Sequence, residues 1–272
     1  MPGRIARSYL FVPANRPERF DKALAAGADA VIVDLEDAVP DADKVQARRA
    51  LAEWLSPAKR ILVRINDAQS PWFADDVALC AAAGVEGVVL PKAERPDQIE
   101  RVVASIGPGK LVIPLLETAT GVFDAVAIAR APQVQRLAFG SIDFQVDLHI
   151  KGDHEELLYF RSQIVLASRV AGVQPPIDGV TTALDDPQQL RLEAARASRL
   201  GFGGKLCIHP KQLALVHECF GPSADEIAWA RRVLDAADAA KGAAVAFDGK
   251  MVDRPVILKA QEILASATLP QR

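Results

Sequence analysis

The sequence predicts a (β/α)8 TIM barrel that is followed by a C-terminal helical extension. First, the chain of 272 residues is long enough for one large α/β barrel. Second, short apolar segments alternate with helix-length amphipathic segments almost to the end of the chain, in eight pairs. Third, several apolar segments lack polar alternation, which is typical of strands covered on both faces. A flavodoxin-like sheet is the alternative, but it normally has about five or six strands and a glycine-rich first loop, whereas the first loop here reads PANRP at residues 13–17.

The eight predicted strands are the apolar segments at residues 8–13, 30–35, 61–65, 87–90, 111–116, 136–139, 176–179 and 204–208. The amphipathic segments that follow them predict helices at 17–26, 42–55, 73–83, 96–105, 121–130, 155–171, 187–200 and 210–218. Two further helices are predicted at 224–240 and 255–267, and the glycine-bearing polar segment 242–253 between them is predicted to be mobile. We therefore predict a barrel over residues 1–220 and a helical extension of the same domain over residues 221–272.

Composition excludes several classes of function. Half of the residues are hydrophobic, and the formal net charge is −3, so nothing attracts the whole molecule to nucleic acid or to an anionic membrane. No apolar segment approaches the length of a membrane span, and the start of the chain has no signal-peptide core. The cysteines lack the spacing of a zinc site or a disulfide framework; they are Cys80, Cys207 and Cys219. A cytoplasmic enzyme with a small-molecule substrate is predicted.

In a barrel of this kind, functional residues lie where strands end and the βα loops begin. These positions form a short set that mixes acids, bases and amides. From strands one to six its members are Asn15 and Arg16, then Asp34, Glu36 and Asp37, then Arg64 and Asn66, then Lys92, then Glu117, and finally Ser141 and Asp143. We expect the active site among these residues.

Two acids in this set predict a metal site. Glu117 follows the apolar segment 111–116, and Asp143 follows the segment 135–142, with a predicted helix between them. Carboxylates at the exits of neighbouring parallel strands converge, and Mg²⁺ prefers a few such oxygens with positions left for water and substrate. The alternative is that each acid caps the following helix, which suits Asp143 better than Glu117 because Thr118 is the better cap there. We favour the metal.

Arg64 ends the third apolar segment, so its guanidinium is expected in the mouth of the barrel. There it can bind a carboxylate or stabilise an enolate oxygen. The structural alternative is an ion pair with Glu36 or Asp37, and both roles are compatible. Strand alternation sends Asp34 and Glu36 to one side and Asp37 to the other. One or two of these acids are expected to be structural, and the sequence leaves open which.

Basic residues follow the first and fourth strands, and they predict a site for a long anionic cofactor. Arg16, Arg19 and Lys22 lie at the first βα loop, and Lys92 and Arg95 follow strand four. Such cations can hold phosphate groups. A solvated basic rim is an equally good interpretation of each of them.

Ten motifs along the chain resemble those of the citrate lyase β-subunit-like family, which is kin to malyl-CoA and citramalyl-CoA lyases in the HpcH/HpaI aldolase superfamily. The resemblance covers nearly the whole chain. The motifs are RSYLFVP (7–13), DLEDAV (34–39), VRIN (63–66), LPK (90–92), ETATG (117–121), FGSIDF (139–144), IDGV (177–180), GFGGK (201–205), IHP (208–210) and GKMVD (249–253).

The resemblance implies a homotrimeric (β/α)8 barrel that binds Mg²⁺ and cleaves 3-hydroxyacyl thioesters. By position, Glu117 and Asp143 match the metal ligands, and Arg64 matches the arginine that binds substrate and steadies the thioester enolate. Asp253 matches an acid that reaches into a neighbouring subunit's site. Two departures concern substrate preference: residues 13–15 read PAN, where many relatives have a glycine, and residues 147–150 read DLHI instead of a short DLG.

We therefore predict a Mg²⁺-dependent carbon–carbon lyase of the oxo-acid-lyase type. It would cleave a malyl-, citramalyl- or citryl-type thioester to acetyl-CoA, or an acetyl-carrier, and a 2-oxo acid, by reversible Claisen-type chemistry. The catalytic residues would be Arg64, Asp253 and Asp37, with Arg16 and Lys22 binding the coenzyme A thioester. The alternatives are a class II aldolase on free 2-oxo acids, a citrate lyase β subunit that needs partner chains, and a non-catalytic binding protein.

Overall fold

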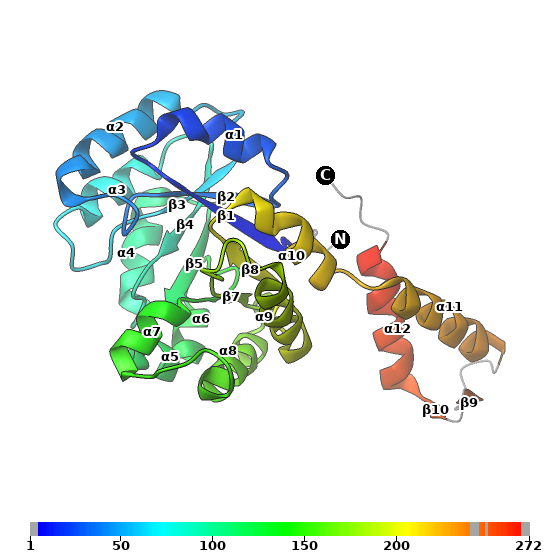
Figure 1. Cartoon of the computed structure of the whole chain (residues 1–272). Coiled ribbons are helices and arrows are strands. Elements are labelled where there is room, and N and C mark those ends of the chain that lie inside the picture. The colour runs from blue at the N-terminus through cyan, green and yellow to red at the C-terminus, as the bar shows by residue number, and fades with distance from the viewer. Residues whose placement is uncertain (1–4, 240–244, 248–249, 268–272) are drawn as a thin grey trace. The chain divides into compact units, whose positions relative to one another are not determined.

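The computed structural model describes residues 5–239, 245–247 and 250–267. Residues 5–216 form one compact unit built on a closed barrel of parallel strands, in which each strand neighbours the next in the sequence (Figure 1). The predicted fold class is confirmed. The strands are β1 (Ser8–Pro13), β2 (Ala30–Asp34), β3 (Ile61–Arg64), β4 (Val85–Leu90), β5 (Leu111–Leu116), β6 (Ala138–Phe139), β7 (Ile177–Asp178) and β8 (Gly204–Cys207).

Register in the sheet brings polar residues from different strands to one level. β1 pairs with both β2 and β8, which closes the barrel. Pro13 is opposite Asp34, and Asp34 is opposite Arg64. The carboxyl ends of all the strands meet at one end of a parallel barrel, so this register fixes which side chains can form the mouth.

Helices and short 3-10 turns connect the strands. In the barrel unit they are η1 (Pro17–Arg19), α1 (Phe20–Ala25), η2 (Asp41–Asp43), α2 (Lys44–Trp54), α3 (Phe73–Leu79), α4 (Pro96–Ile106), α5 (Ala119–Phe123), α6 (Ala125–Ala129), α7 (Ser141–Leu148), η3 (Glu155–Leu157), α8 (Leu158–Ala171), α9 (Pro187–Leu200), η4 (Pro210–Gln212) and α10 (Leu213–Cys219). Two features differ from prediction. The helix predicted at 121–130 divides into α5 and α6 where Asp124 leaves helical geometry, and α7 was not predicted.

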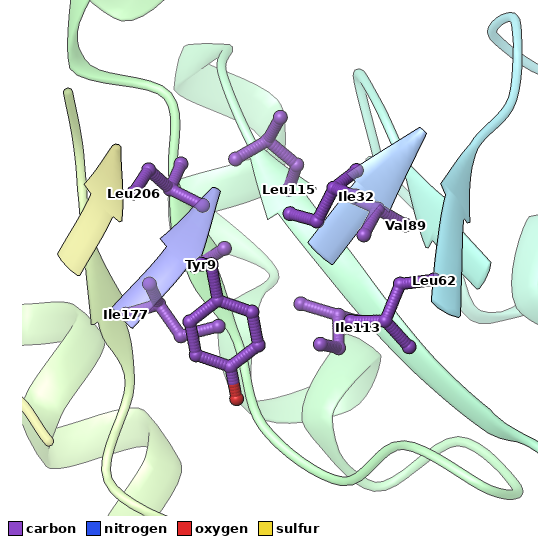
Figure 2. Packing of buried hydrophobic residues seen from close by; sticks show 9 residues of the cluster. Tyr9, Ile32, Leu62, Val89, Ile113, Leu115, Ile177 and Leu206 are labelled. Carbon is purple, nitrogen blue, oxygen red and sulfur yellow. The ribbon is translucent and has the colours of Figure 1, made fainter. Parts of the chain in front are cut away.

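Apolar side chains of alternate strand residues fill the interior of the barrel. Figure 2 shows this cluster, which includes Tyr9, Ile32, Leu62 and Leu115. Side chains alternate between the two faces of a strand, so residues two positions further along point the same way. The alternation that buries Ile32 and Leu62 therefore also directs Asp34 and Arg64 inward, just above the apolar layer.

Buried ion pairs connect helices α8 and α9 to strands β7 and β8. Arg161 of α8 donates to Asp178 at 2.9 Å, and Lys205 of β8 lies 3.6 Å from Asp178 and 3.8 Å from Glu193 of α9. All four side chains are buried. Asp178 and Lys205 alternate with the interior residues Ile177 and Leu206, so they face the helices and not the mouth.

A second compact unit contains the described residues from 217 onward. It consists of α11 (Ala224–Ala239), an antiparallel pair of strands, β9 (Val245–Phe247) and β10 (Lys250–Val252), and α12 (Arg254–Ala267). Ala230, Val233, Val252 and Ala260 form its core. The segment 242–253 was predicted to be mobile, and its described residues include both strands. The prediction that residues 221–272 extend the barrel domain stays a prediction. In the described part of the chain, every helix is too short or too polar to cross a membrane.

Candidate active site

Polar residues from five neighbouring strands meet at the mouth of the barrel. Asp34 ends β2, Arg64 ends β3, Lys92 follows β4, Glu117 follows β5, and Asp143 lies in the first turn of α7 after β6. All five belong to the set of strand-end residues predicted from the sequence. Hydrogen bonds join Arg64 to Asp34 and Lys92 to Glu117, and the charges of Arg64 and Asp143 both act on Glu117.

Arg64 is held in one orientation by Asp34. Its Nε donates to Oδ1 at 2.7 Å, and its Nη2 donates to Oδ2 at 2.6 Å, so the pair is bidentate. The guanidinium also lies over the ring of Phe11, 4.8 Å from its centre. Burial favours the neutral form, but the charges of Asp34 and Glu36 outweigh it and raise the pKa of Arg64 above its ordinary value. Arg64 is therefore a permanent, oriented cation.

Glu36 lies between the two cations of the mouth. Its Oε1 accepts from Lys92 Nζ at 2.6 Å, and its Oε2 is 3.0 Å from Arg64 Nη1. Burial raises the pKa of Glu36 to about 7, although Arg64 and Lys92 oppose this effect. Asp37, in contrast, is exposed and lies 3.6 Å from Arg64 Nη1. Asp34 and Glu36 thus have structural partners, which leaves Asp37 as the acid of this group that is open to solvent.

Glu117 is almost completely buried, with 2% of its surface exposed. Its Oε2 accepts the backbone N–H of Lys92 at 2.8 Å. Lys92 has a φ of 48°, in the left-handed region that few non-glycine residues adopt and that is enriched at functional sites. Burial, followed by the charge of Glu36, raises the pKa of Glu117 to about 8, and Asp143 adds to the rise while Arg64 opposes it.

Gly140 gives Glu117 its space. A Cβ added at Gly140 would lie 2.3 Å from Cγ of Glu117 and 2.6 Å from Oε1, closer than any real contact. The glycine therefore allows the carboxylate to lie directly against the start of α7, the helix whose first turn carries Asp143. Gly140 stands within the FGSIDF motif, but the sequence does not reveal its contact with Glu117.

Two carboxylates form the candidate metal centre. Within residues 5–239, 245–247 and 250–267, no group of three or more histidine, cysteine, aspartate and glutamate side chains is arranged to hold a metal ion. Glu117 and Asp143 alone suit a hard cation that takes few protein oxygens and keeps its remaining positions for water or substrate. Burial, and then the charges of Glu36 and Asp143, raise the pKa of Glu117, and a bound cation would favour its carboxylate form.

A cavity of about 640 Å³ adjoins the mouth on the side of β2, β3 and β4. Glu36, Asp37 and Lys92 line its inner end, and Lys44, Asn66 and Trp72 line the rest together with neighbouring loop residues. The buried Lys44 was missed in the sequence analysis. It carried a usable signal, because it occupies the apolar stripe of its helix together with Ala47 and Leu51.

The residues predicted to bind coenzyme A and the predicted acid Asp253 have other surroundings. Arg16 and Lys22 are exposed at the first βα loop and in α1, and Arg16 lies 3.7 Å from Glu18. Lys92, one candidate for a phosphate contact, is instead paired with Glu36. Asp253 belongs to the second unit, where it is exposed and accepts the N–H of Val256 at 3.4 Å as the cap of α12.

Comparison with known proteins identifies the family. The model for HpcH/HpaI aldolase/citrate lyase matches residues 7–210. A citrate lyase subunit beta-like protein of Deinococcus radiodurans is 40% identical over 280 residues, which cover 97% of this chain and 98% of that protein. A (3S)-malyl-CoA thioesterase of Cereibacter sphaeroides is 35% identical over 271 residues, which cover 96% and 94%.

Among solved structures, CitE of Mycobacterium tuberculosis in complex with magnesium, acetoacetate and coenzyme A superposes with a TM-score of 0.87. The two proteins are 38% identical, and the match covers 97% of this chain and 99% of that one. The family model spans the barrel, and these relatives align over nearly the whole chain. The protein therefore belongs to the HpcH/HpaI aldolase/citrate lyase family.

Proposed function

We propose that the protein is a Mg²⁺-dependent carbon–carbon lyase. It would cleave a malyl-, citramalyl- or citryl-type thioester to acetyl-CoA, or an acetyl-carrier, and a 2-oxo acid, and it would catalyse the reverse condensation. The observation that carries the proposal is the placement of the buried Glu117 where the charges of both Asp143 and the oriented Arg64 act on it. A similar structure that holds magnesium, acetoacetate and coenzyme A supports it.

Glu117 and Asp143 would hold the metal ion. Their oxygens are the ligands that Mg²⁺ prefers, and the space left by Gly140 lets Glu117 lie against the start of α7, the helix that carries Asp143. When bound there, Mg²⁺ would supply Lewis-acid chemistry by polarising the hydroxyl and carboxylate oxygens of the acyl group.

Arg64 would stabilise the enolate oxygen. Breaking the carbon–carbon bond leaves an electron pair on the acetyl carbon, and the charge is delocalised onto the thioester oxygen. Asp34 fixes Nε and Nη2 of Arg64. Nη1 is 3.0 Å from Glu36 Oε2, an atom that makes no hydrogen bond among the described residues. Nη1 would donate to a substrate oxygen, in an orientation that Asp34 has already set.

Two exposed acids would move protons. Asp37 would accept the hydroxyl proton whose loss accompanies cleavage, because Asp34 and Glu36 are already paired with Arg64 and Lys92. Asp253, from a neighbouring copy of the chain, would exchange the proton at the acetyl carbon. The exposure of Asp253 suits this role. A homotrimer would supply the neighbouring copy.

Arg16 and Lys22 would bind the phosphates of coenzyme A. Both side chains are exposed at the first βα loop and in α1, where an extended anionic ligand that enters the mouth can reach them. The alternative functions differ in this requirement. A class II aldolase acting on free 2-oxo acids would need neither residue, and a citrate lyase β subunit would need partner chains.

The first experiment is a cleavage assay of malyl-CoA and citramalyl-CoA that follows acetyl-CoA and the 2-oxo acid. We expect release of both products, loss of activity with EDTA, and no Mg²⁺-dependent turnover in a folded Glu117→Ala variant, because one of two metal ligands is removed. Full activity of that variant would contradict the metal assignment. If the folded wild type cleaves neither thioester, a partner-dependent subunit or an aldolase acting on free acids is favoured.

Substitution Gly140→Ala tests how the metal ligand is positioned. The added Cβ would displace Glu117, so we expect the affinity for Mg²⁺ to fall by about tenfold or more, with the fold retained. Isothermal titration with MgCl2 measures it. Gly107→Ala is the control, because its Cβ would meet nothing within 4 Å and its φ of +80° affects stability alone. Equal affinity in both variants would exclude the proposed positioning.

Stability of the metal-free protein should fall as the pH rises. The pKa values of Glu117 and Glu36 are raised to about 8 and about 7 in the native state. At a pH between the ordinary pKa of an unfolded glutamate and these raised values, the native state therefore binds more protons than the unfolded state. Its free energy of unfolding therefore decreases with pH over this window, and the stabilisation by Mg²⁺, which binds the carboxylate form, increases. Thermal unfolding between about pH 5 and about pH 8 measures both effects. The slope should be smaller in Glu117→Gln; an identical slope would contradict the assignment.

Mixing two inactive variants tests whether Asp253 acts in a neighbouring subunit. Asp253→Ala keeps an intact barrel, and Glu117→Ala keeps an intact C-terminal acid. After denaturation and refolding together, random trimers should recover up to about a quarter of wild-type activity. A mixture of Arg64→Ala with Glu117→Ala is the control, and it should stay inactive if both residues serve the same barrel. The absence of recovery in the first mixture would refute the shared site.

A further inference from the structure

We propose that Lys44 and Asn66 are positioning residues of the active site. They fix the backbone at Glu36 by hydrogen bonds. The side chain of Glu36 in turn contacts Arg64 and Lys92 and so determines the positions of these two cations. This inference rests on the proposed function only for its effect on turnover, because the positioning itself can be measured without a substrate.

Lys44 is buried at the start of α2, with 6% of its surface exposed. Its Nζ donates to the carbonyl oxygen of Leu35 at 3.0 Å, to that of Glu36 at 2.9 Å, and to Oδ1 of Asn66 at 2.7 Å. These three acceptors use all three protons of the ammonium group. The carboxylate of Asp41 lies 4.0 Å away and is highly exposed, so neutral oxygens make the close contacts.

Asn66 links this ammonium to two helices. Its Nδ2 donates to the carbonyl of Leu35 at 3.0 Å and to Oδ2 of Asp76 at 2.7 Å. Its backbone N–H donates to the same Oδ2 at 3.0 Å. Oδ1 of Asp76 accepts from Nε of Arg48 at 2.9 Å. The end of β2 is therefore tied to α2 and α3 through buried groups.

The ties converge on the backbone of Glu36. Its carbonyl accepts from Lys44, and its N–H donates to Oδ1 of Asp34 at 2.9 Å. With both backbone groups fixed, the side chain extends to Lys92 at 2.6 Å and lies 3.0 Å from Nη1 of Arg64. Asp34, which also orients Arg64, belongs to the same connected set. A shift of this backbone would change the position of both cations of the mouth.

Burying an ammonium without a close carboxylate is unfavourable, and an apolar side chain would anchor α2 with less desolvation. The buried polar side-chain atoms of Lys44, Asn66 and Asp76 have hydrogen-bond partners, and such a network specifies one arrangement. At its edges, Nη2 of Arg48 and Oε2 of Glu36 make no hydrogen bond with any described residue. The arrangement specified here is that of the residue that contacts Arg64 and Lys92. The metal ligands Glu117 and Asp143 come from other strands, so the network should affect turnover more than metal affinity.

The test compares Lys44→Met with Arg49→Met. Arg49 lies on the same helix, and its exposed side chain pairs with Glu53 at 3.0 Å. In Lys44→Met we expect kcat for the cleaved thioester to fall by about tenfold or more, with KM and the Mg²⁺ affinity within about threefold of wild type. Hydrogen exchange followed by mass spectrometry should be faster at residues 35–38 and unchanged in β5 and β8. The Arg49→Met variant should match the wild type in every measurement.

Equal exchange and equal kcat in Lys44→Met and Arg49→Met would overturn the proposal, as would faster exchange throughout the barrel. If Lys44→Met does not fold, Asn66→Ser asks the same question, because it keeps the backbone N–H to Asp76 and removes the contacts to Leu35 and Lys44. If the wild type cleaves no thioester, the proposed function fails. The exchange at residues 35–38 then decides this inference alone.

Discussion

The ion pair of Arg64 with Asp34 lies where the apolar interior of the barrel ends and the polar mouth begins. Below it, side chains such as Ile32 and Leu62 fill the barrel. A guanidinium at this depth requires a carboxylate, because an unpaired buried charge is strongly destabilising. Register supplies the carboxylate, since Asp34 and Arg64 are opposite each other on neighbouring strands. The same bidentate contact fixes the orientation of the guanidinium at the mouth, so one interaction neutralises a buried charge and orders the candidate site.

Charge balance explains why the mouth suits a divalent cation. Within the cluster described above, the acids outnumber the cations. The acids are Asp34, Glu36, Asp37, Glu117 and Asp143, and the cations are Arg64 and Lys92. Burial is the main cause of the raised pKa of Glu117, and the neighbouring acids Glu36 and Asp143 add to the rise. Lys92 stabilises two of the carboxylates, because its side chain pairs with Glu36 and its backbone N–H donates to Glu117. A bound cation would complete the balance and allow an anionic substrate to approach.

Much of this arrangement could be predicted from the sequence, and the exceptions have physical causes. All eight strands lie where apolar segments predicted them, because strands covered on both faces leave a strong signal. The helix α7 was missed because it is short and mixes polar with apolar residues on the rim. Gly140 and Lys44 were missed as functional residues because their roles depend on what lies across the fold: the side chain of Glu117 in one case, the carbonyls of Leu35 and Glu36 in the other.

Strand phase, and not residue type, decides which buried acids belong to the site. Asp34 and Asp178 both end barrel strands, both are buried, and both pair with an arginine. Asp34 is two residues after the interior residue Ile32 and therefore points into the mouth. Asp178 directly follows the interior residue Ile177 and therefore points to α8, where Arg161 meets it. An acid at a strand end is therefore a candidate for the site. An even number of residues from the last interior residue directs it toward the mouth, and an odd number directs it toward the surrounding helices.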